Sequence, residues 1–342
     1  MKQTILLTGA CGNVGYETLK ELYNRKEQYN IRTFDLPTKT NIKKLKYFHT
    51  GVQFFWGDIT NYSDILKAVK GSDFIIHTAA LIPPAADKFP ELAEKINVNG
   101  TYNICKAIKN TNPETFLLFT SSISVYGDRT ENPEITTFDK LKPSEGDFYA
   151  QTKIKAEETI KINLTNFTIF RLSAVMHTKM KLDPLFFHMP LKTSLEIITT
   201  KDSAFALVEA IQKKDFLNEQ IFNVGGGINC RITYKDFLDK NFKIFGLKKL
   251  DFPKYAFAER NFHCGFYKDS YILNDFLHFQ RDTIEDYFKS VYKSVNPITK
   301  FISVTFNKLI KNNLLKKSDP YKAVQSRNTD LINFFLKNSF KY

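Results

Sequence analysis

The sequence contains little cysteine and no long apolar stretch. Only four of its 342 residues are cysteine, and none of them has Cys-x-x-Cys spacing. This argues against a disulfide framework and against a zinc site, so we expect reduced thiols and no bound metal. No apolar run reaches the roughly 18 residues that a membrane-spanning helix needs. The opening MKQTILLTGACG is too short and too rich in glycine for a signal peptide. We therefore expect a cytoplasmic protein.

Acidic residues are scarce only near the C-terminus. Residues 289–342 contain eleven Lys or Arg against two Asp, which is a net charge of +9 out of +13 for the whole chain. The excess is thus a property of the tail, and the rest of the chain is close to balanced. No helix-turn-helix, zinc-finger or aromatic-platform pattern accompanies the charge. We expect no nucleic-acid partner.

Short apolar strands alternate with helical segments over residues 1–172. The helices are expected at 13–25, 62–70 and 89–110. The expected strands are QTILLTG, IRTFDL, VQFFWGD, SDFIIHTAA, TFLLFTSS and FTIFRLS. Strands that are apolar throughout and separated by helices are typical of a parallel sheet covered on both faces. The sequence therefore predicts an α/β fold with a doubly wound, Rossmann-type parallel sheet.

The alternation weakens after residue 172. Residues 173–288 are expected to form a smaller substrate-binding portion, interleaved with the first sheet through a strand near 221–224 in IFNVGGG. Residues 289–342 are expected to be a basic helical extension. Within it, a helical pattern after Pro297 has apolar residues at 298, 302, 306 and 309 or 310. The preferred interpretation is that this face packs on the body or on a second subunit, and peripheral membrane contact is the alternative.

A glycine-rich loop lies directly between the first strand and the first helix. It contains Gly9, Gly12, Asn13, Val14 and Gly15 in TGACGNVG. Glycines allow a tight turn and let a pyrophosphate approach the backbone, and the N-terminus of the helix then receives the phosphate charge. Asp35 ends the second strand, where a carboxylate can accept the ribose hydroxyls of an adenosine. That carboxylate would repel a 2′-phosphate, so we favour NAD over NADP, although Lys39 follows closely.

Tyr149 and Lys153 are four residues apart at the start of a predicted helix in GDFYAQTKIKAEE. Residues at this spacing are neighbours on a helix surface. A nearby cation favours the phenolate form of tyrosine, and a tyrosine tuned in this way can transfer protons near neutral pH. We therefore expect Tyr149 to be an acid/base group and Lys153 to be its partner.

The order of these patterns resembles the extended short-chain dehydrogenase/reductase family of NAD-dependent epimerases and dehydratases, which includes UDP-galactose 4-epimerase. The resemblance is strong over residues 2–172 and faint beyond. It is carried by TGACGNVG, FDL, WGDIT, HTAA, NVNGT, FTSSISVYG, YAQTK and FNVGGG. It implies that Ser122, Tyr149 and Lys153 are catalytic. It also implies that Tyr149 and Lys153 contact the cofactor. Five further residues are expected at the cofactor by the same resemblance: Asp58, Ile59, Ala79, Ala80 and Asn99.

Two departures from the family pattern narrow the expected reaction. Ile123 and Ser124 stand where the sugar 4,6-dehydratases carry an Asp-Glu pair, which argues against a dehydratase. No arginine occurs between Arg171 and Arg231, so the usual grip on a nucleotide diphosphate is missing and a UDP-sugar substrate is in doubt. His263, among aromatic residues, is either a substrate-pocket residue or a partly buried structural histidine.

The resulting hypothesis is an NAD-dependent oxidoreductase that transfers hydride between nicotinamide and a carbinol or carbonyl substrate. The small-molecule substrate is unidentified, a sugar nucleotide being one candidate, and we expect a homodimer. Epimerisation of a nucleotide sugar through transient oxidation is the first alternative. A non-catalytic NAD-sensing or scaffold protein is the second alternative, and the presence of Ser122, Tyr149 and Lys153 argues against it.

Overall fold

A computed structural model describes residues 2–178 and 184–337. Its centre is a seven-stranded sheet in which all neighbouring strands are parallel, in the order β10-β7-β5-β4-β1-β2-β3. The strands are β1 (Gln3–Thr8), β2 (Tyr29–Asp35), β3 (Val52–Trp56), β4 (Phe74–His77), β5 (Phe116–Ser122), β7 (Phe167–Leu172) and β10 (Gln220–Val224). The predicted α/β class is confirmed. Because the chain winds outward in both directions from β1, a crevice is expected at the carboxyl ends of β1 and β4.

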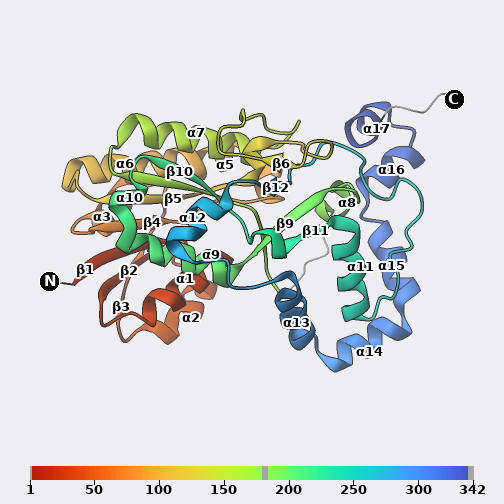
Figure 1. The fold of residues 1–342 in the computed structure, drawn as a ribbon, viewed down its shortest axis with the longest axis horizontal. Coiled ribbons are helices and arrows are strands. Elements are labelled where there is room, and N and C mark those ends of the chain that lie inside the picture. Colours follow the sequence, from red (N-terminus) through yellow and green to blue (C-terminus); the bar gives the residue numbers. More distant parts are fainter. Residues whose placement is uncertain (1, 179–183, 338–342) are drawn as a thin grey trace.

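Helices cover both faces of this sheet (Figure 1). One face carries α1 (Asn13–Tyr23), α9 (Thr200–Glu209) and α12 (Ser270–Leu277); the other carries α3 (Tyr62–Val69), α6 (Gly100–Thr111) and α7 (Phe148–Asn163). Successive strand residues point to opposite faces. Thus Ile5 and Leu7 join the core beneath α1, while Leu6 joins the core beneath α3. The expected long helix at 89–110 is built from α5 (Pro90–Ala93), a π-helical segment Glu94–Asn99 and α6.

A smaller unit holds a three-stranded sheet, β11-β9-β8, and a two-stranded sheet, β12-β6. The bounds are β6 (Glu134–Ile135), β8 (Ala174–Met176), β9 (Ser194–Thr199), β11 (Arg231–Thr233) and β12 (Phe266–Tyr267). Its core packs α8 (Leu185–His188) against α11 (Tyr234–Phe245) through aromatic residues that include Phe186, Phe187 and Phe242. Because β10 lies in the large sheet beside β7, residues 173–288 are interleaved with the first part, and the divisions at 172 and 288 stay predictions.

Five helices form the C-terminal part of the chain: α13 (Ile284–Ser294), α14 (Pro297–Thr305), α15 (Asn307–Leu315), α16 (Asp319–Gln325) and α17 (Thr329–Phe335). They run past α11 and α8 on the side away from β1 (Figure 1). Thr283 caps α13 through a reciprocal pair of hydrogen bonds with Asp286. The expected helix after Pro297 is present but breaks at Phe306. Packing of its apolar face on the body is not seen at α14, which has no buried residue.

A helix that crosses a membrane must be both long and apolar. Within residues 2–178 and 184–337, none of the helices combines the length and the apolar character needed to cross a bilayer.

Candidate active site

The glycine-rich loop makes a tight turn between β1 and α1. Gly9 has φ +78°, a left-handed conformation that favours glycine, and its N–H donates to the carbonyl of Phe34 at 3.0 Å. A Cβ atom on Gly15 would lie 2.1 Å from the carbonyl oxygen of Gly9, so only glycine allows α1 to start this close to the turn. Gly12 is the N-cap and Asn13 the first residue of α1, whose N-terminal N–H groups face the loop.

Asp35 ends β2 beside this loop. Its carboxylate accepts hydrogen bonds from the backbone N–H of Ala10 at 3.1 Å and of Cys11 at 2.9 Å. Burial raises the pKa of Asp35 to about 6, opposed by the hydrogen bonds from Cys11 and Ala10. A carboxylate has room for about four hydrogen bonds, so Asp35 retains the capacity to accept from a ligand hydroxyl.

A cavity of about 350 Å³ opens along the carboxyl ends of β1, β2 and β4. Of the predicted cofactor residues, its lining contains Gly9, Gly12, Asp35, Asp58, Ile59, Ala79 and Ala80. Asp58 is exposed and also accepts from the N–H of Thr60 at 2.9 Å, so it is both a turn residue and a lining residue. A cleft with a bare glycine turn, a helix N-terminus and a carboxylate fits an NAD(P)-type dinucleotide.

Asn99 is exposed at the start of α6 and is not among the residues that line this cavity, so its predicted place at the cofactor stays a prediction. Asn97 is the buried residue. Its amide accepts from the N–H of Leu81 at 2.7 Å and donates to the hydroxyl of Thr152 at 2.9 Å. Asn97 and Asn99 are two positions apart in the π-helical segment Glu94–Asn99. Their side chains therefore point in different directions, and the sequence pattern did not indicate which of the two contacts α7.

Ser122, Tyr149 and Lys153 come together at the carboxyl edge of β5. Ser122 ends that strand, and its hydroxyl accepts from the N–H of Ser124 at 3.1 Å. The same hydroxyl is close enough to the Tyr149 phenol to lower the pKa of that group. Tyr149 is in the first turn of α7, and Lys153 lies one turn later, with its Nζ 5.7 Å from the centre of the Tyr149 ring. The Lys153 Nζ donates to the Thr120 carbonyl at 2.7 Å.

The electrostatics of this group differ from the sequence-based expectation. Burial raises the pKa of Tyr149, and the carboxylates of Asp147 and Asp87 raise it further, while the Ser122 hydrogen bond lowers it. Burial also lowers the pKa of Lys153 to about 7. The lowered phenol pKa expected from Lys153 is therefore not seen in the protein alone, because the buried ammonium is itself disfavoured and is directed at the Thr120 carbonyl.

A buried ion pair between Glu157 and Arg171 lies next to the carboxyl edge of β5. Glu157, one turn after Lys153 on α7, binds the guanidinium of Arg171 at 2.6 and 3.0 Å and accepts from the Ser121 hydroxyl at 2.5 Å. Arg171 also donates to the hydroxyl of Tyr126 at 2.8 Å. The network ties α7 to β5 and β7. Sequence reasoning missed it, although the i, i+4 spacing of Lys153 and Glu157 placed Glu157 on the same helix face.

A second cavity, of about 470 Å³, adjoins the first turn of α7. Asp87 and Asp147 line it, and the Asp87 carboxylate also accepts the N–H of Tyr149 at 3.3 Å. Its apolar lining consists of Pro83, Pro84, Pro184, Leu185, Phe262, Phe334 and Phe335. His263 lines the cavity and its Nδ1 lies 2.9 Å from the carboxylate of Asp147. His263 therefore lines a cavity and has a structural partner, and its role as a substrate-pocket residue stays a prediction.

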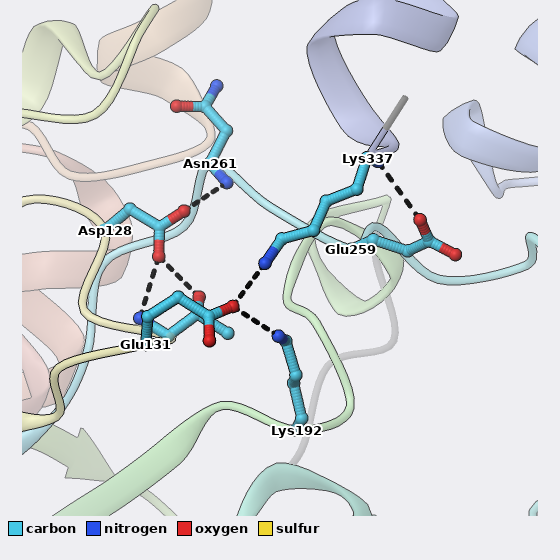
Figure 2. Close-up of polar contacts among 7 residues, drawn as sticks. Asp128, Glu131, Lys192, Glu259, Asn261 and Lys337 are labelled. Carbon is cyan, nitrogen blue, oxygen red and sulfur yellow. Dashed lines mark hydrogen bonds and ion pairs between the residues drawn. The ribbon is translucent and has the colours of Figure 1, made fainter. Parts of the chain in front are cut away.

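Helix α17 forms one wall of this second cavity. Phe334 and Phe335 of α17 line it, and the carbonyl of Phe335 accepts the N–H of Glu259 at 2.8 Å. Just beyond, the side chain of Lys337 meets Glu131, which also binds Lys192 at 2.5 Å (Figure 2). The loop after β5, the segment before β9 and the end of α17 are thereby joined.

Arg231, Arg260 and Arg281, which follow the arginine-free stretch of the sequence, are not among the lining residues of either cavity. Arg231 binds the buried carboxylate of Glu196 at 3.0 Å and donates to the Tyr267 carbonyl at 2.7 Å. Arg260 is exposed and Arg281 stacks on Phe205 at 4.1 Å. Within the part of the chain that the structure describes, no arginine lines the second cavity.

Residues 6–178 match the model of the 3-beta hydroxysteroid dehydrogenase/isomerase family. The chain belongs to this family, which confirms the predicted membership of the extended short-chain dehydrogenase/reductase superfamily.

Curated relatives match part of the chain. Mouse 3 beta-hydroxysteroid dehydrogenase type 7 is 33% identical over 123 residues, which are 36% of this chain and 33% of that protein. A decarboxylating sterol-4-alpha-carboxylate 3-dehydrogenase of Candida albicans is 30% identical over 166 residues, 46% of this chain and 45% of that protein. UDP-glucose 4-epimerase of Rickettsia typhi is 24% identical, covering 59% and 57%. The chain therefore spans about a third to somewhat more than half of these relatives.

A solved structure shares the fold over most of the chain. UDP-glucuronic acid 4-epimerase from Bacillus cereus, in complex with UDP-glucuronic acid and NAD, has a TM-score of 0.69 at 18% identity. The match covers 85% of this chain and 98% of that one. At this identity the likeness concerns the fold alone.

Proposed function

We propose that this protein is an NAD-dependent dehydrogenase that oxidises a secondary alcohol on a substrate with an apolar body. The observation that carries the proposal is the position of Tyr149. Its N–H contacts Asp87 of the second cavity. Thr152, on the same helical turn, is linked through Asn97 to Leu81 of the first cavity. Tyr149 is thus linked by hydrogen bonds to residues that line both cavities.

The roles of the side chains follow from their contacts. Ser122 would hold the substrate oxygen, and Tyr149 would take the hydroxyl proton as the carbonyl forms. A bound nicotinamide supplies the acceptor for the hydride that leaves the carbinol carbon. Lys153 would hold a ribose hydroxyl beside Tyr149. The reaction consumes the alcohol and the oxidised cofactor and yields a ketone, the reduced cofactor and one proton.

The apolar lining of the second cavity supports the choice of substrate class. Among the described residues that line it, seven are Pro, Leu or Phe and none is arginine, and the acidic ones are Asp87, Glu145, Asp147 and Asp319. A nucleotide diphosphate needs cationic or N–H partners, whereas a largely apolar alcohol gains by removal of its surface from water. The names of the curated relatives, which include hydroxysteroid and sterol dehydrogenases, support the same class.

The position of Asp35 supports NAD as the cofactor. A 2′-phosphate placed where the carboxylate can accept ribose hydroxyls would meet a like charge. Lys39 is exposed, and the Lys44 Nζ donates to the Cys11 carbonyl at 2.8 Å, so a cation lies near the loop. We expect NADP to bind more weakly than NAD.

The proposal is tested by product analysis. The protein is incubated with NAD and a panel of apolar secondary alcohols, with UDP-glucose as the comparison substrate, and NADH is measured at 340 nm together with the product mass. One NADH per ketone from an apolar alcohol is expected. An epimer of UDP-glucose without net NADH would instead establish an epimerase.

A further inference from the structure

The surface of α14 and the start of α15 exposes a continuous apolar face. Phe301 is 72% exposed, Ile298 70% and Leu309 61%. Ile302 and Phe306 are also exposed. Ile298, Phe301 and Ile302 lie on one side of α14, because residues three and four apart are neighbours on a helix surface. Phe306 follows at the break after α14, and Leu309 lies in the first turn of α15. Such a face is normally buried, yet α14 has no buried residue.

Within the segment of sequence that carries this face, the charged side chains are all basic. No Asp or Glu occurs between Tyr287 and Asp319, whereas seven lysines do: Lys289, Lys293, Lys300, Lys308, Lys311, Lys316 and Lys317. Lys289 pairs with Asp286, and Lys311 is buried beside Asp251. Lys293, Lys308, Lys316 and Lys317 are exposed. Lys248 and Lys249, which follow α11, are also exposed and extend the basic border, because α14 contacts α11.

We propose that the face formed by Ile298, Phe301, Ile302, Phe306 and Leu309 is a docking surface for an anionic membrane. An amphipathic helix with lysines beside its apolar face lies in the plane of the headgroups, with its apolar residues inserted at the edge of the acyl chains. Lysines near an anionic leaflet add attraction. The helix forms an outer edge of the molecule beyond α11 (Figure 1), so a flat surface can reach it without contact with the parallel sheet.

Charge decides between a membrane and a second copy of this chain. Two copies that met through this face would bring two lysine clusters together with no acidic residue of the same segment to offset them, and like charges that face each other at an interface oppose association. An anionic bilayer provides both an apolar interior and the opposite charge. The membrane is therefore the occupant that fits both observations.

Vesicle co-sedimentation tests the proposal and needs no substrate. The full chain is pelleted with phosphatidylcholine vesicles that contain either no phosphatidylserine or about 30% phosphatidylserine, a content at which lysines near the surface are attracted. We expect binding to the anionic vesicles, weakened in 0.5 M salt, where the Debye length is about 4 Å. No pelleting with anionic vesicles would overturn the proposal.

Matched variants separate the apolar face from charge alone. Phe301→Ser with Ile302→Ser should reduce the partition coefficient at least about tenfold. Because neither side chain is buried, the fold should be kept, which circular dichroism checks. Phe138→Ser, which alters another highly exposed aromatic residue, should leave binding unchanged. Equal loss with Phe138→Ser, or full binding by the double variant, would contradict the proposal. A dimer in lipid-free sedimentation that the double variant abolishes would assign the face to a second copy instead.

Discussion

Asp147, two residues before Tyr149, accepts a 2.9 Å hydrogen bond from Nδ1 of His263 through its carboxylate. A carboxylate can only accept, so the imidazole nitrogen carries the proton. The other oxygen of Asp147 accepts the N–H of Ala150 at 2.8 Å and caps α7. One side chain thus fixes the start of the helix that carries Tyr149 and places a negative charge near its phenol.

Replacement of Asp147 tests this electrostatic relationship. Asp147 raises the pKa of Tyr149, so Asp147→Asn should lower it, and the rise of kcat/KM with pH should move to lower pH. Asparagine caps a helix as well as aspartate does, so thermal stability should change little. The measurement is a pH–rate profile of alcohol oxidation. An unchanged midpoint in a folded variant would show that Asp147 does not act on the phenol.

The buried Lys153 predicts a pH dependence of stability. Its pKa is about 7 in the native protein and about 10.5 when exposed. Between these values the unfolded state binds a proton that the native state lacks. The free energy of unfolding should therefore rise with pH from 7 to about 10.5, by up to about 1.4 kcal/mol per pH unit from this group.

Lys153→Met removes the titrating group and keeps most of the side-chain length. Urea unfolding of both proteins at pH 7.5 and pH 9.5 should show the variant gaining less stability from the higher pH than the wild type. If both proteins gain equally, Lys153 does not titrate in this range in the native state.

Asp35 predicts a pH dependence of cofactor affinity. Its pKa is raised to about 6, so its charge is lost as the pH falls through that value, and a protonated carboxyl accepts ribose hydroxyls less well. The Kd for NAD, measured by NADH-competition fluorescence, should increase from pH 7.5 to pH 5. In Asp35→Asn the Kd for NAD should change less between pH 7.5 and pH 5. The ratio of the Kd values for NADP and NAD should also be smaller than in the wild type. The same pH dependence in Asp35→Asn would assign it to another group.

We expect Phe334 of α17 to contribute to substrate binding, because it lines the second cavity. Its side chain is half-buried. Phe334→Ala should raise the KM for an apolar alcohol about tenfold, the scale set by the loss of an aromatic contact, while kcat changes little. Phe138→Ala, which lies at an exposed position, should leave the KM as in the wild type. If the KM of Phe334→Ala is also unchanged, the substrate does not reach α17.

The sequence predicted those parts of the site that are local in the chain. Gly9, Gly12 and Asp35 are identified by their position at strand ends, and Tyr149 and Lys153 by their helical spacing, because both features depend only on neighbouring residues. The proximity of Ser122 and Tyr149 followed from the family pattern. The structure brings these side chains to one edge of the sheet.

Features that depend on packing were not predictable in this way. The choice between Asn97 and Asn99 depends on how the π-helical segment Glu94–Asn99 is rotated. The pair of Asp147 and His263 joins residues 116 positions apart. The pKa of Lys153 is set by burial that its spacing from Tyr149 does not reveal. The apolar residues of α14 have a core-like pattern, and only the fold shows that nothing in the described chain covers them.

The most direct test of the account compares the wild type with Tyr149→Phe. NAD affinity is measured by calorimetry, and NADH formation at 340 nm is followed with an apolar alcohol that the wild type oxidises. The account predicts equal NAD affinity and a rate at least about a hundredfold lower in the variant, the scale of a lost general acid/base. An undiminished rate, or no binding of NAD to either protein, would contradict it.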